Sequence, residues 1–184
     1  MNKGLNETII EKDGYKFLVD IEKTKVYYNK QELCECAGCR NYYAQVKEKF
    51  PWFDAFLKEF GVDITRPDEI SWYDNDNKIC YIFVGFTACG KVLNDEDYEF
   101  IIEDKPKVKC VISNGKDPFG CFPNSQEGNY FEIVIEEFSL PWVLDESYSE
   151  TFSTNNIISR VNSNSTTLFN RIKTIFKKRE KKVD

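Results

Sequence analysis

Histidine is absent from this chain of 184 residues. Imidazole is the side chain that titrates near neutral pH without help from its surroundings, and it is the most frequent proton shuttle in enzymes. Its absence excludes Ser-His and Cys-His hydrolase chemistry, so any catalysis here must use carboxylates or thiols. A metal site in this chain must likewise bind through sulfur or oxygen.

Long apolar runs and an export signal are also lacking. The longest apolar run covers residues 79–86, whereas a helix that crosses a bilayer needs roughly 18 apolar residues or more. Residues 1–15 are mostly polar or charged and lack the apolar region of a secretory signal. We therefore expect a cytoplasmic protein without a transmembrane segment. The glycines match neither a Walker nor a dinucleotide-binding pattern, so no motif indicates nucleotide binding.

Charge is unevenly distributed along the chain. The formal net charge is −6, but the residues from Arg160 onward carry eight Lys or Arg against only Glu180 and Asp184. The part before Arg160 therefore carries about −12. An acidic body repels nucleic-acid phosphates, so we expect no nucleic-acid partner and a preference for a basic protein.

The first third of the chain predicts a hairpin and a helix. Apolar and polar residues alternate at 15–21 and again at 26–28, with a polar break between them, which indicates an opening hairpin. Apolar residues at steps of three and four then predict one long helix over residues 40–60, ended by Gly61. Pro51 lies inside this helix and must either kink it or occupy the first turn of a second helix.

The following residues are dominated by β-branched and aromatic runs separated by turn residues. Short connections between consecutive runs indicate an antiparallel meander. We therefore predict a single two-layer α+β domain over residues 1–146, with an antiparallel sheet of about six strands and the long helix packed on one face. The strands predicted after the helix are residues 70–73, 79–89, 98–103, 108–113 and 130–138.

Residues 147–184 predict a Ser/Thr/Asn-rich linker followed by a basic amphipathic tail. Apolar residues of the tail fall on one face of a short helix, with Lys and Arg around it. Such a segment can fold back on the acidic body, remain a solubilising tail, touch an anionic membrane surface or dock onto a protein. The residues predicted to make tail contacts are Phe169, Ile172, Phe176, Lys177 and Lys178.

Three of the seven cysteines, Cys34, Cys36 and Cys39, form a CxCxxC cluster at the predicted start of the long helix. The odd count and the lack of an export signal indicate reduced thiols or metal ligands rather than disulfides. Zinc prefers four soft ligands in a closed structural site. We predict a zinc site with Cys121 as the fourth ligand, and Cys89 is the other candidate for that position.

Two other interpretations of the cluster stay open. Small buried thiols can pack a turn against a helix without binding anything, as we expect for Cys80 and Cys110 within the sheet. Alternatively, a thiol near a helix N-terminus, such as Cys39, can be a redox or nucleophilic group because the helix dipole stabilises its thiolate.

The cysteine cluster is also the centre of a sequence resemblance. The run CECAGCRNYY at residues 34–43 continues into residues 50–69, and LPWVLDE at residues 140–146 forms a second block. Together they resemble a family of small uncharacterised bacterial proteins that carry a CxCxxC cluster. The two blocks bracket the predicted domain, and the resemblance implies no activity, substrate or cofactor.

Aromatic and acidic side chains give two candidate partner-binding surfaces. Trp52 and Phe56 lie on the predicted helix, where aromatic residues usually form core but can also widen the apolar stripe into a binding face. Asp95, Glu96 and Asp97 form an acidic cluster that can steer a basic protein or simply keep a sheet edge soluble.

Taken together, the sequence favours a non-enzymatic intracellular binding protein with a structural cysteine–zinc site. Its acidic body would recognise a protein partner in an immunity or regulatory role. The alternative is a thiol- or metal-dependent enzyme that uses Cys34, Cys36 and Cys39. A zinc ion with an open coordination position would favour the enzyme, whereas a closed site would favour the binding protein.

Overall fold

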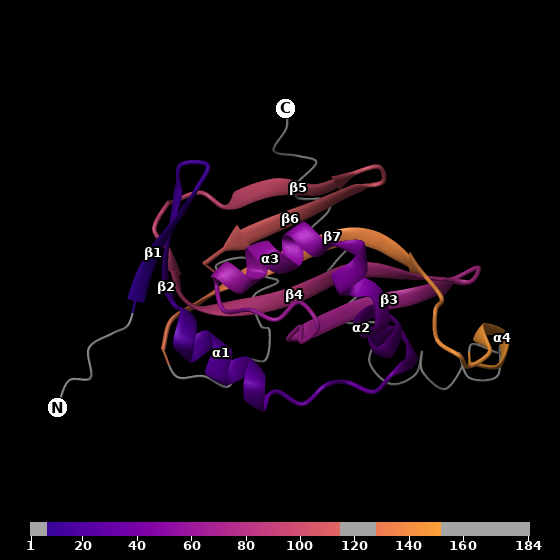
Figure 1. Cartoon of the computed structure of the whole chain (residues 1–184). Helices are drawn as coiled ribbons and strands as arrows, with labels where there is room; N and C mark the ends of the chain where they lie inside the picture. Colours follow the sequence, from indigo (N-terminus) through magenta and orange to yellow (C-terminus); the bar gives the residue numbers. More distant parts are fainter. Residues whose placement is uncertain (1–6, 115–127, 152–184) are drawn as a thin grey trace, which may run out of the picture. The chain divides into compact units, whose positions relative to one another are not determined.

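The computed structural model of the chain describes residues 7–114 and 128–151 (Figure 1). The chain divides between Leu144 and Asp145 into two units, which are described separately. Within the described part of the second unit there is one short helix, α4 (Tyr148–Thr151), in which the Thr151 hydroxyl donates to the Ser147 carbonyl at 2.8 Å. No helix of the described residues is long and apolar enough to cross a membrane. The remainder of this section concerns the first unit.

The first unit is a mixed α+β structure built on an open sheet of seven antiparallel strands. Along the sheet the order is β1-β2-β4-β7-β6-β5, and β3 pairs with β4 beside that path. Each strand pairing given by the register is antiparallel. The strands are β1 (Glu7–Lys12), β2 (Tyr15–Asp20), β3 (Glu69–Asn75), β4 (Lys78–Val92), β5 (Tyr98–Asp104), β6 (Lys107–Ser113) and β7 (Tyr130–Pro141).

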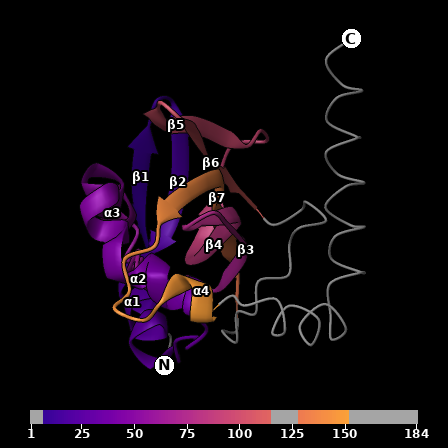
Figure 2. The ribbon, with the colours of Figure 1, turned by 90° about the vertical axis from the view of Figure 1, so that its right-hand side faces the viewer.

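Three short helices cover one face of this sheet, as Figure 1 and the quarter-turned view of Figure 2 show. They are α1 (Ile21–Lys30), α2 (Ala37–Lys49) and α3 (Pro51–Glu59). The core between the two layers is rich in aromatic rings. Phe60, at the end of α3, contacts Phe17 of β2 and Phe131 of β7 with ring centroids 5.4 and 5.9 Å apart. The prediction of a two-layer α+β domain is therefore confirmed at the level of its layers.

The predicted opening hairpin is wrong in its position. The hairpin pairs β1 with β2 through Asp13 and Gly14, whose φ angles of 49° and 83° are those of a two-residue Asp-Gly turn. Residues 26–28, predicted as its second strand, belong to α1 instead. The side chain of Asp20 caps that helix by accepting from the Lys23 amide at 2.9 Å.

The single long helix predicted over residues 40–60 is also wrong. Pro51 begins a second helix, α3, which is one of the two alternatives that the sequence left open for that proline. Between the helices, Phe50 has φ −127° and ψ 61°, outside the helical region. The apolar spacing continues across this break because both helices bury their faces against the same sheet.

The sheet is not a simple meander of about six strands. β4 has 15 residues, and β7 pairs along it from Lys78 to Cys89, so the following strand β5 lies at the outer edge instead. On its other edge, β4 pairs with β3 up to Gly85 and with β2 from Gly90 to Val92. Turn residues indicate where a strand ends, but the choice of its neighbour depends on long-range packing.

Between the stretches paired with β3 and β2, the edge of β4 is satisfied by side chains of α1. The Tyr28 hydroxyl accepts from the Thr87 amide at 3.0 Å and donates to the Thr87 carbonyl at 2.8 Å. The Thr24 hydroxyl accepts from the Cys89 amide at 3.0 Å. Buried backbone groups without partners are costly, so these bonds allow α1 to lie where a strand would otherwise be needed.

Asp68, a partly buried carboxylate, forms hydrogen bonds with residues of α1 and β4 in the same region. It accepts hydrogen bonds from the Tyr27 hydroxyl, from the Gln31 amide at 3.1 Å and from the Thr87 hydroxyl at 2.8 Å. Burial nevertheless raises the pKa of Asp68 to about 6, because loss of water disfavours the charged carboxylate more than these hydrogen bonds favour it.

Asp68 should make the stability of the protein depend on pH. Its pKa is 3.8 ordinarily and about 6 when folded, so the folded state holds this proton more tightly than the unfolded chain. The protonated carboxyl stabilises the fold fully below the unfolded pKa, and this stabilisation is lost as the pH rises through the folded pKa. The free energy of unfolding should fall by at most about 3 kcal/mol. Urea unfolding between about pH 4 and about pH 6.5 should show this loss in the parent protein and not in Asp68→Asn.

Asp104→Asn, at an exposed position, serves as the control and should keep the parent profile. Parallel stability profiles for the parent and Asp68→Asn would contradict this role of Asp68.

Candidate metal centre

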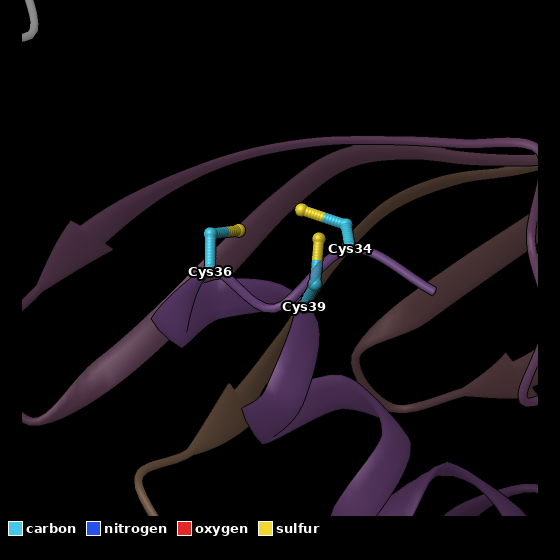
Figure 3. A group of neighbouring side chains, drawn as sticks. All are labelled: Cys34, Cys36 and Cys39. Atoms are coloured by element: carbon cyan, nitrogen blue, oxygen red, sulfur yellow. The ribbon is translucent and has the colours of Figure 1, made fainter. Parts of the chain in front are cut away.

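Cys34, Cys36 and Cys39, called the thiol triad below, point their sulfur atoms toward one another (Figure 3). Their Sγ atoms all lie within 4.8 Å of one another. Cys34 is exposed in the segment between α1 and α2, Cys36 is half-buried at the N-cap of α2, and Cys39 is buried in the first turn of that helix. The prediction that these three thiols cluster is therefore confirmed.

The backbone on either side explains why the thiols converge. Cys36 is extended, with φ −67° and ψ 155°. Alternate residues of an extended segment lie on one side of the chain, which agrees with the closeness of the Cys34 and Cys36 sulfurs. The helix starts at once, since the Arg40 amide donates to the Cys36 carbonyl at 3.0 Å. Cys39 then follows Cys36 by three residues and returns to the same face.

The C-terminus of α1 is fixed as well. Arg66 donates through Nη1 to the Gln31 carbonyl at 2.7 Å and to the Tyr28 carbonyl at 3.2 Å, and the Tyr28 carbonyl also accepts from the Gln31 amide at 3.3 Å. The segment that carries Cys34 and Cys36 therefore leaves the helix from a defined point.

Two residues of the sheet hold the start of α2, and neither was predicted as part of the site. The Tyr81 hydroxyl of β4 donates to the Gly38 carbonyl at 2.9 Å. The indole of Trp72 in β3 lies directly against Gly38, where a Cβ would come within 2.2 Å of Trp72 Cε2. Only a glycine at this position lets the ring approach so closely. A glycine in the first turn of a helix is the one sequence signal that could have indicated such an approach.

The surroundings shift the pKa values of Cys36 and Cys39 in opposite directions. The pKa of Cys36 is lowered to about 5, mainly by its hydrogen bond with the Cys39 side chain and further by the Cys34 thiol and the Trp72 indole, although burial opposes this. The pKa of Cys39 is raised by the same contact with Cys36 and by burial. The pKa of the nearby Tyr43 hydroxyl is raised by burial and by Cys39. One proton shared between Cys36 and Cys39 accounts for the opposite directions.

This group could hold a metal ion. Thiolate sulfur is a soft ligand that favours zinc, cuprous ion and iron–sulfur clusters over magnesium or calcium. Over the described part of the chain, the group contains the three cysteines and no carboxylate. The low pKa of Cys36 means that the first of the required thiolates forms with little loss of free energy at neutral pH.

The other cysteines lie apart from the triad or outside the described residues. Cys110 is fully buried in the core, as predicted. Cys89 is buried beside Thr24 and does not belong to the triad group, and Cys80 is half-buried and lines an open pocket with Tyr73 and Glu137 rather than packing in the core. Cys121, predicted as the fourth ligand, lies outside the described residues.

The candidate partner-binding residues differ in exposure. Trp52 is 47% exposed, and its indole donates to the Ile102 carbonyl at 3.1 Å. Phe56 is only 8% exposed and packs against Phe100 with ring centroids 5.0 Å apart. Binding of a protein partner through these surfaces stays a prediction. Asp95, Glu96 and Asp97 lie between β4 and β5, and the tail residues Phe169, Ile172, Phe176, Lys177 and Lys178 lie outside the described residues.

Comparison with family models, with curated proteins and with solved structures finds no match to this chain. The thiol triad must therefore be interpreted from its own geometry and chemistry.

Replacement of Gly38 by alanine tests the packing of Trp72 on the site. Helix propensity alone predicts that Gly38→Ala stabilises α2 by up to about 1 kcal/mol. The contact with Trp72 predicts the opposite, a destabilisation of about 1–3 kcal/mol, because the new methyl group would overlap the ring. The coupling between the two positions is measured by urea unfolding of Gly38→Ala, Trp72→Ala and the double variant.

In the background without the indole, Gly38→Ala should be neutral or stabilising. An equal effect of Gly38→Ala in both backgrounds would show that the ring does not constrain this position.

Proposed function

We propose that the thiol triad binds one zinc ion in a structural role and that the protein in this zinc-bound state is a non-enzymatic binding protein. The observation that carries this proposal is the convergence of the three Sγ atoms within 4.8 Å of one another. Zinc–sulfur bonds are about 2.3 Å long, so two sulfurs on one tetrahedral zinc lie about 3.8 Å apart. The triad is therefore within about 1 Å of the spacing that zinc requires, a shift that side-chain rotation supplies.

A structural role agrees with the position of the triad. The cysteines lie where the connection from α1 enters α2, and Tyr81 and Trp72 hold that point against the sheet. A metal ion bound here would link the connecting segment to the first turn of α2, so its binding free energy would add to the stability of the fold. The indole hydrogen bond to Cys36 would orient a ligand, as groups around the ligands of metal sites commonly do.

Zinc binding predicts a defined stoichiometry and a loss of stability when the metal is removed. Protein purified without chelator should contain about one zinc per chain and should unfold at a lower temperature after treatment with a chelator. Cys36→Ser should weaken zinc binding by at least about tenfold, because it removes a thiolate ligand that touches both other members of the triad. Elemental analysis and competition with a chromophoric chelator provide the measurements.

Cys80→Ser is the matched control, since Cys80 is half-buried like Cys36 but lies outside the triad. It should retain the parent zinc affinity. Metal-free protein from every preparation, or equal affinities for Cys36→Ser and Cys80→Ser, would reject the zinc site.

The identity of the fourth ligand can be read from the same protein loaded with cobalt. Thiolate-to-cobalt charge-transfer absorption grows with the number of bound sulfurs, so a site with four thiolates and a site with three thiolates and a water differ in intensity. If Cys121 is the fourth ligand, as the sequence predicts, Cys121→Ser lowers this absorption by about one quarter. An unchanged spectrum would assign the fourth position to another ligand.

A further inference from the structure

We infer that Cys36 and Cys39 also form a reversible dithiol–disulfide couple that exchanges electrons with external disulfides. This activity goes beyond metal binding and uses two of the same thiols in their metal-free state. The two residues form a Cys-Ala-Gly-Cys motif. Cysteines with two residues between them recur in proteins that exchange disulfides, where one thiol attacks and the other resolves.

The position at the helix start selects this pair within the triad. The Sγ atoms of Cys36 and Cys39 lie within the 4.8 Å limit of the triad. They also belong to one turn at the start of α2, where residues three apart share a face. Formation of the disulfide therefore requires rotation of side chains about a fixed backbone rather than a rearrangement of the fold.

Differences in exposure assign the two roles. Cys36 is half-buried and can be approached from solvent, whereas Cys39 is 5% exposed. An external disulfide therefore reaches Cys36 before Cys39. The buried thiol is left to react with the mixed disulfide from inside, where its Sγ atom lies within 4.8 Å of the Cys36 Sγ atom.

The exchange balances in two steps. The Cys36 sulfur attacks one sulfur of a disulfide RSSR, the S–S bond breaks, and one thiol RSH leaves with a proton from Cys36. The Cys39 sulfur then attacks the Cys36 sulfur of the mixed disulfide, the second RSH leaves with the proton from Cys39, and the Cys36–Cys39 disulfide remains. Two electrons have passed from the protein to the external disulfide, and a dithiol of suitable potential reverses the reaction.

Cys34 separates this activity from the metal site. It supplies a third sulfur to a bound ion but is not part of the couple. Oxidation of Cys36 and Cys39 consumes two metal ligands, so bound zinc and the disulfide exclude each other. Cys34→Ser should therefore lose zinc and keep the couple, whereas Cys39→Ser should lose both.

The test treats metal-free, reduced, full-length protein with glutathione disulfide and maps the products by mass spectrometry of its peptides. The parent protein should give the Cys36–Cys39 disulfide with no glutathione attached to either residue. Cys39→Ser should trap about one glutathione on Cys36, because the resolving thiol is absent. Cys36→Ser should slow the oxidation of Cys39 by about tenfold or more. Cys80→Ser, the matched control, should behave as the parent protein.

Circular dichroism confirms that each variant is folded before the reaction. A parent protein that accumulates glutathione on Cys34 without the Cys36–Cys39 disulfide would overturn the inference, and so would a Cys39→Ser variant without an adduct on Cys36. Zinc content is measured on the same samples. The disulfide without zinc binding would reject only the metal site, and zinc binding without the disulfide would reject only the couple.

Discussion

The backbone of β4 is the constraint on which the rest of the first unit depends. Its one edge pairs with β7, and its other edge is shared by β3, β2 and the hydroxyl groups of Thr24 and Tyr28 in α1. A buried strand edge must be satisfied throughout, so the fit of α1 against β4 fixes where that helix lies. Tyr81 of the same strand then bonds to Gly38 and fixes the start of α2. The position of the thiol triad thus follows from the hydrogen bonding of one strand.

The chemistry of the thiol triad arises from its uneven exposure. Three equivalent surface thiols would each ionise separately and would be held in no fixed arrangement. Here a buried, a half-buried and an exposed cysteine bring their sulfurs close together, and the contact between Cys36 and Cys39 moves their pKa values in opposite directions. The same arrangement suits a soft metal ion, which replaces protons on the sulfurs, and a disulfide, which replaces them with a covalent bond. Both chemistries use the contact between Cys36 and Cys39, and they differ in their need for Cys34.

Local sequence signals predicted the elements better than their partners. Runs of β-branched and aromatic residues between turn residues located the five later strands, and the CxCxxC spacing brought three sulfurs close together. The local signal for the first hairpin is Asp13-Gly14, and the alternation at residues 26–28 predicts a strand where Asp20 instead caps a helix. Trp72 and Gly38 could not be paired from the sequence, because 34 positions separate them and only the sheet brings them together.

The sequence by itself determined the α+β character, the absence of imidazole chemistry and the clustering of Cys34, Cys36 and Cys39, since each depends on composition or on residues a few positions apart. Only the tertiary structure decided the order of the strands, the choice between the two alternatives for Pro51 and the unequal environments of the three cysteines. These features depend on which distant groups share a buried surface and on which of them exchange hydrogen bonds. Such shared surfaces and hydrogen bonds join residues that are far apart in the sequence, so they leave no periodic pattern in the chain.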